Sequence, residues 1–247
     1  MKRLRGFVCV LGLLLSCGCS GGAVRLPAAD YTVEFTEEYF FRDAAVDVKL
    51  AYPAVSGLKD EKAADALRTA AKAYAYARFE EEGLTASGDV RYSYSVNDTK
   101  LMLAAPGFLS TMIGGVISAD SGGVRFFSYT FNYDLTAGAA LEAQDVFADY
   151  GAVRTLFEAG RFRQDFGYAS LAREVSLTDL IAQYRPEYGV YPRVYFSEGR
   201  LGLLVETVPS LDGYAGFSID IRQVRDMLRT DNPAIAMLCG LPDDQDS

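Results

Sequence analysis

The residues best placed for a covalent reaction are Leu14-Leu15-Ser16-Cys17, near the start of the chain. Three basic residues lie within the first five positions, an apolar run follows over residues 7–15, and small residues come next. This order is typical of a secretory signal, and the apolar run is too short to cross a bilayer comfortably. Leu at −3 and Ser at −1 before a cysteine fit bacterial lipoprotein processing. We therefore expect residues 1–16 to be a signal peptide and Cys17 to be the lipid attachment site.

Two acyl chains on one thiol would give stable membrane anchoring, which a single chain does not. Residues 17–30 are then a lipidated tether, and the protein lies on the extracytoplasmic side of the outer or cytoplasmic membrane. Two alternatives stay open. Ordinary secretion would leave Cys17 unmodified or remove it. Cleavage before Cys19 would put Ser16 at −3, which fits the pattern less well than Cys17 does.

Ser56 and Lys59 have the Ser-x-x-Lys spacing of serine acylases, in which the lysine helps to deprotonate the hydroxyl one helical turn away. The sequence lacks the Ser-Asp-Asn and Lys-Thr-Gly motifs that accompany it, and Gly57 weakens a rigid helical start. We interpret this segment as a solvated loop.

Carboxylates are the remaining candidates for acid–base chemistry. A glycosidase needs two of them about 5 to 10 Å apart, but the sequence has 33 and its spacing selects no pair. The chain has no histidine, which removes the commonest zinc ligand and the usual general base. Its glycine doublets lack the lysine of a phosphate loop. We expect no catalytic residue, no metal site and no cofactor.

The segment over residues 209–214 favours binding instead. It places a proline, a glycine and apolar and aromatic side chains together in a loop, and such restrained residues make good contact anchors. We name Pro209, Asp212 and Tyr214 as partner-contact residues. The alternative is a loop that folds onto its own sheet.

Charge narrows the choice of partner. The chain carries a net charge of −9, and removing residues 1–16 takes away three positive and no negative charges, which leaves about −12. Such a surface repels nucleic-acid phosphates and favours a basic protein partner. Solubility alone is the other explanation.

Periodicity predicts an α+β fold with mostly antiparallel sheet: a strand-strand-helix opening, a β-rich block, two helices and three closing strands. The expected strands cover residues 31–36, 46–52, 90–96, 101–103, 108–118, 124–135, 193–196, 201–207 and 215–221. The expected helices cover residues 61–82, 153–166, 177–185 and 222–228, with a resumption at 233–238. Pro53 is expected to end the second strand. Along 124–135, Phe127, Tyr129, Phe131 and Tyr133 share one face, which we interpret as core.

Three segments together resemble known families. Residues 46–55, with Tyr52-Pro53 before a long helix, resemble the opening of the domain of unknown function 4163. Residues 129–138 (Tyr-Thr-Phe-Asn-Tyr-Asp-Leu-Thr-Ala-Gly), followed by Asp145-Val146-Phe147, resemble the centre of its companion, domain of unknown function 3298. Its closing strands are matched by Val194-Tyr195-Phe196 and by residues 201–205 and 214–217. The resemblance covers residues 30–225.

The resemblance implies two parts, 31–118 and 119–240, that form one compact unit before an acidic tail at 241–247. It implies an extracytoplasmic domain without established catalysis. In one branch such a domain is the lysozyme-binding part of an anti-sigma factor, and in another it accompanies a peptidoglycan deacetylase. The histidine that often precedes the family's central strand is absent, since only Gly122-Gly123 stands there.

Two functions compete on this evidence. The first is a lipid-anchored, non-catalytic binding module for an envelope or basic protein partner, such as a lysozyme-like muramidase. The second is a cell-wall hydrolase that uses paired carboxylates.

Overall fold

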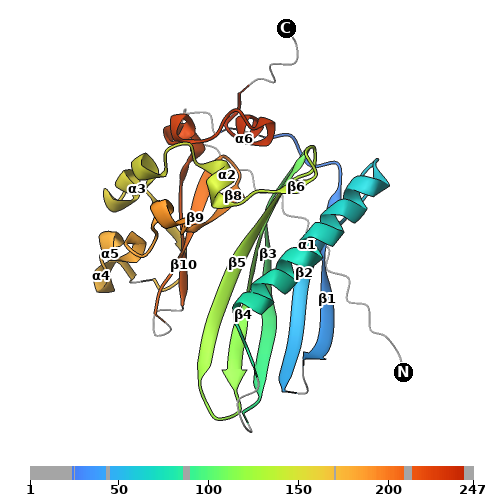
Figure 1. Ribbon diagram of the computed structural model, residues 1–247. Helices are drawn as coiled ribbons and strands as arrows, with labels where there is room; N and C mark the ends of the chain where they lie inside the picture. The colour runs from blue at the N-terminus through green and yellow to red at the C-terminus, as the bar shows by residue number, and fades with distance from the viewer. Residues whose placement is uncertain are drawn as a thin grey trace.

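Two β-sheets form most of the protein in this computed structural model, which describes residues 24, 26–42, 45–85, 90–169, 171–208 and 213–241. The first sheet has the strand order β1-β2-β3-β4-β5-β6 and the second has the order β7-β10-β9-β8 (Figure 1). The strands are β1 (Thr32–Arg42), β2 (Val46–Ser56), β3 (Tyr92–Ala105), β4 (Phe108–Ala119), β5 (Val124–Asp134), β6 (Ala139–Ala140), β7 (Arg163–Phe166), β8 (Arg193–Ser197), β9 (Arg200–Glu206) and β10 (Tyr214–Asp220). The helices are α1 (Glu61–Glu81), α2 (Ala143–Val146), α3 (Tyr150–Glu158), α4 (Leu171–Glu174), α5 (Leu177–Ile181) and α6 (Pro233–Leu238). The α+β fold with mostly antiparallel sheet is confirmed.

The strand-strand-helix opening is present, with one correction. Strand β2 continues past Pro53, which lies opposite Phe35 of β1. On its other side, β2 pairs in parallel with β3 only from Val46 to Lys49. Pro53 therefore lies where β2 has a single hydrogen-bonded neighbour, and a strand tolerates a proline where its missing N–H would not enter a ladder.

Helix α1 is the crossover between the parallel strands β2 and β3, and it lies across one face of the first sheet (Figure 1). It begins at the N-cap Asp60, whose side chain accepts the Lys62 N–H at 2.9 Å. The residues it buries recur at helical spacing and are Leu67, Ala71, Ala75 and Phe79. Helix α1 thus presents one apolar stripe to the sheet, as expected.

The aromatic face of β5 packs under this helix. The ring of Tyr74 on α1 lies 5.9 Å from that of Tyr129 and 5.4 Å from that of Phe131. Phe127, Tyr129, Phe131 and Tyr133 are all buried. The interpretation of this face as core is therefore confirmed.

The opposite face of β5 is polar and also buried, at Ser128, Thr130, Asn132 and Asp134. It meets β8, the edge strand of the second sheet. Asn132 Nδ2 donates to the Val194 carbonyl at 2.9 Å, and its Oδ1 accepts from Ser110 Oγ at 2.7 Å. Ser110 Oγ in turn accepts the Phe196 N–H at 3.0 Å. Two side chains of the first sheet therefore satisfy backbone groups of β8.

The helices that accompany the second sheet differ in length and type from those predicted from the sequence. Helix α3 ends at Glu158, and the N–H of Gly160, at φ 69°, bonds the Phe157 carbonyl. A glycine in the left-handed region ends a helix in this way. The expected helix over 153–166 is therefore too long, and its last residues form strand β7, which pairs with β10. The expected helix over 222–228 is two short 3₁₀ turns, whereas α6 forms where the resumption is expected.

We predict that Asn132→Ala will lower the free energy of unfolding by about 2–3 kcal/mol, because it leaves a buried carbonyl and a buried hydroxyl short of a partner. Chemical denaturation measures the change. Asn97→Ala, on an exposed residue of β3, is the matched control and should stay within about 0.5 kcal/mol of the unmodified protein. Equal stability of the two variants would contradict the role assigned to Asn132.

Candidate functional site

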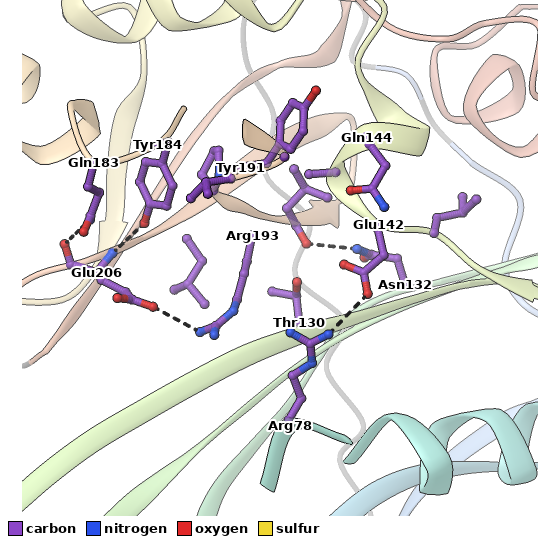
Figure 2. Close-up of a pocket in the computed structure, with 17 residues that line it drawn as sticks. Arg78, Thr130, Asn132, Glu142, Gln144, Gln183, Tyr184, Tyr191, Arg193 and Glu206 are labelled. Atoms are coloured by element: carbon purple, nitrogen blue, oxygen red, sulfur yellow. Dashed lines mark hydrogen bonds and ion pairs between the residues drawn. The ribbon is translucent and has the colours of Figure 1, made fainter. Parts of the chain in front are cut away.

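A polar cleft of about 520 Å³ lies where the two sheets meet. Its walls come from α1, from β5, from the start of α2, from the segment between α5 and β8, and from β8 and β9 (Figure 2). Four charged side chains line it: Arg78, Glu142, Arg193 and Glu206. Clefts of this size at the junction of two structural units are common ligand sites.

Arg193 and Glu206 form one charged pair of the cleft. Arg193 opens β8, and its Nη1 donates to the backbone carbonyl of Ser128 on β5. The same nitrogen lies 3.6 Å from Glu206 Oε1, at the end of β9. The side chain of Glu206 is 51% exposed and that of Arg193 is 31% exposed. The guanidinium is therefore the more deeply placed partner.

Arg78 and Glu142 form the second pair. The Arg78 guanidinium lies over the ring of Tyr74, 4.6 Å from its centre, and its Nη1 lies 2.9 Å from Glu81. Its Nη2 lies 3.8 Å from Glu142, and its buried Nε has no hydrogen-bond partner in the described part of the chain. The side chain of Glu142 is 41% exposed and that of Arg78 is 24% exposed. Here too the carboxylate lies closer to solvent.

Separate contacts hold the backbones of both glutamates. The Glu206 N–H donates to Tyr184 Oη at 3.0 Å, and Gln183 Nε2 donates to the Glu206 carbonyl at 3.3 Å. The Glu142 N–H donates to Asp145 Oδ2 at 2.9 Å, at the start of α2. Both carboxylates therefore project from fixed backbone positions.

The cleft can bind charged and polar groups without rearranging its own. Both ion pairs are longer than the 2.7–2.9 Å of a charge-assisted hydrogen bond. Each of the four groups therefore keeps capacity for a bound molecule. The described residues contain no group of three or more Cys, Asp or Glu side chains placed to hold a metal ion.

The sequence-predicted site residues lie mostly outside the described structure. Cys17, Pro209 and Asp212 fall there, so their roles stay predictions. Tyr214 is described and half-buried, and its hydroxyl donates to the Phe126 carbonyl at 3.2 Å. It opens β10 directly opposite Glu206, so the base of the predicted contact loop adjoins the cleft.

Ser56 and Lys59 do not share a helix. Ser56 ends β2, α1 begins only at Glu61, and both residues are exposed. This placement agrees with a solvated loop.

Sequence reasoning did not find the cleft's four charged residues. They are dispersed over positions 78 to 206, on elements that only the tertiary fold brings together. The one local signal is a charged residue at the first position of β8 and at the last position of β9, where each strand's apolar run stops.

The chain was compared with known proteins. No family model matches it, and no curated protein matches it. The solved structures that resemble it include two of the DUF3298 family. One is from Bacteroides fragilis, with 15% identity, a TM-score of 0.49 and coverage of 87% of this chain and 99% of that one. The other is from Pseudomonas aeruginosa, with 14% identity, a TM-score of 0.45 and coverage of 83% and 94%. Neither likeness assigns a function to this chain.

No helix in the described ranges has both the length and the apolar character needed to cross a membrane.

Tyr184, which lines the cleft, makes the free energy of unfolding depend on pH. Burial raises its pKa from 10.0 to about 12, although the Glu206 N–H opposes the shift. Between these values the unfolded chain loses the proton first, so the free energy of unfolding falls as pH rises. We predict that Tyr184→Phe will flatten the fall between about pH 10 and 12 by roughly 1 kcal/mol per pH unit.

Denaturation at a series of pH values measures this slope. Tyr188→Phe, at a residue that is 74% exposed, is the control and should leave the slope unchanged. An unchanged slope in Tyr184→Phe would contradict the assignment.

Proposed function

We propose that this protein is a membrane-anchored extracytoplasmic lipoprotein that acts as a non-catalytic binding module for an envelope or basic protein partner, such as a lysozyme-like muramidase. The observation that carries the proposal is the charge pairing in the cleft. Its two lining carboxylates, Glu142 and Glu206, each face a guanidinium. Opposite charges held at fixed positions are suited to the recognition of a charged partner.

The acidity of the chain supports a basic partner. The net charge of −9 speeds encounter with a positively charged protein through complementary fields. The connection from Glu206 to Tyr214 leaves the sheet beside the cleft, because these two residues are paired across β9 and β10. Pro209 and Asp212 lie within this connection. The described ends of this connection therefore lie beside the cleft.

A cell-wall hydrolase is the second candidate function. One observation favours it: Glu142 and Glu206 line the same cavity, as the acid and base of a glycosidase would. Their arginine neighbours argue for binding instead. Degradation of peptidoglycan by the protein would distinguish the hydrolase from the binding module.

We predict that the purified chain will retain lysozyme at low salt and release it as ionic strength rises, because screening weakens attraction between opposite charges. Surface plasmon resonance at several salt concentrations measures this. Asp212→Asn should weaken retention severalfold, while Glu158→Gln, which removes an Arg–Glu pair on α3, is the charge-matched control and should leave it unchanged. No retention at low salt would exclude this ligand.

We further predict that the protein will not degrade peptidoglycan, as measured by release of soluble fragments. Turnover that is lost in Glu142→Gln or Glu206→Gln, but kept in Glu158→Gln, would establish the hydrolase and overturn the binding module.

Cys17→Ser tests the anchor. We predict that this variant moves from the membrane fraction to the soluble fraction, because removing the thiol removes both acyl chains. Cys239→Ser is the control, since Cys239 is a buried residue beyond α6, and it should leave the distribution unchanged. Membrane retention of the Cys17→Ser protein would contradict lipidation at this residue.

A further inference from the structure

We propose that the cleft binds a short zwitterionic molecule with a free ammonium and a free carboxylate group, such as an unblocked dipeptide. The inference goes beyond the proposed function, which names a protein partner and assigns no small-molecule ligand to the cleft. It does not depend on the lipid anchor or on the protein partner.

The charge balance of the cleft carries the first step. Among the described residues, its lining holds two guanidinium groups and two carboxylates, and no other ionisable acid or base except tyrosines. A simple anion would meet two groups of its own sign, and so would a simple cation. A neutral molecule would use none of these charges, which compensate one another in the free cleft only through pairs at 3.6 and 3.8 Å. A zwitterion can satisfy one group of each sign at the same time.

The depths of the four groups set the orientation. The guanidinium-bearing side chains are 24% and 31% exposed, whereas the carboxylate-bearing ones are 41% and 51% exposed. A ligand carboxylate therefore reaches inward to Arg78 or Arg193, and the ligand ammonium stays near the mouth with Glu142 or Glu206. The loose pairs, at 3.6 and 3.8 Å, leave donors and acceptors for such contacts.

Polar side chains on the walls of the cleft can bind the peptide group that lies between the two charges of the ligand. Figure 2 shows Glu206 and Gln183 on one side of the cleft and Glu142 and Gln144 on the other. The amide of Gln144 can both donate to and accept from a peptide group, whereas Gln183, whose Nε2 already donates to the Glu206 carbonyl, offers its Oε1 as an acceptor. The volume of about 520 Å³ lies within the roughly 300–1,000 Å³ of small-molecule sites.

The test uses four alanine dipeptides: unblocked, N-acetylated, C-amidated and blocked at both ends. Isothermal titration calorimetry with the full-length protein in detergent measures their affinities. We expect saturable binding of the unblocked dipeptide, an affinity lower by at least about tenfold for each single block, and no binding of the doubly blocked form. Equal affinities for all four, or no saturation by the unblocked dipeptide up to about 10 mM, would overturn the proposal.

Substitutions in the cleft test which residues bind the ammonium and which bind the carboxylate of the dipeptide. Glu206→Gln and Glu142→Gln should weaken binding of the unblocked dipeptide and reduce the penalty for acetylation. Arg78→Gln should reduce the loss of affinity that C-amidation of the dipeptide causes. Circular dichroism checks whether this variant folds. If it does not fold, the two glutamate variants still test the site. Glu158→Gln, outside the cleft, should change nothing. If acetylation and amidation of the dipeptide weaken binding to all three cleft variants as much as to the unmodified protein, the proposed site is wrong.

Failure here is distinguishable from failure of the proposed function. Lysozyme retention measured with the same preparations reports on the protein partner. Dipeptide binding without lysozyme retention would refute the partner and keep the cleft, and the reverse result would refute the cleft and keep the partner.

Discussion

The contact between the polar face of β5 and the free edge of β8 is the constraint on which the remaining structure depends. An edge strand exposes N–H and C=O groups that must find partners when they are buried. Here Asn132 and Ser110 supply those partners to Val194 and Phe196, at 2.9 and 3.0 Å. Shape alone would let two apolar sheet faces slide, whereas these bonds have one geometry. The junction therefore fixes the orientation of the second sheet relative to the first. The position of the cleft between the sheets depends on this orientation.

Strand β5 has two roles because its side chains alternate. Its aromatic residues face α1 and form core, while the polar residues between them face β8. A one-residue shift in the register of β5 would exchange the two faces, bury the polar side chains under α1 and remove the junction. The long antiparallel pairing of β5 with β4, from Val124 to Asp134, opposes such a shift. The cleft thus depends on sheet register as much as on its own residues.

The sequence predicts those parts of the fold that local periodicity determines. It identifies α1 with its apolar stripe, the β4–β5 hairpin and the buried face at Phe127 to Tyr133. It places the end of the second strand wrongly at Pro53, because only the pairing shows that one side of β2 is open there. It extends the helix at 153–166 too far, although Gly160 carries the stop signal. The cleft lies beyond local patterns, since Arg78, Glu142, Arg193 and Glu206 come from separate elements and a charged residue in a sequence is most often simply solvated.

Different neighbours hold the four charged residues of the cleft in place. Glu81 and the Tyr74 ring hold Arg78, and the Ser128 carbonyl holds Arg193. The N-terminus of α2 fixes Glu142, while Tyr184 and Gln183 fix the backbone of Glu206. The two guanidinium groups and the backbones of the two glutamates are therefore held at defined positions without a ligand. A site arranged in this way loses little conformational freedom on binding. This preorganisation is what a recognition site needs.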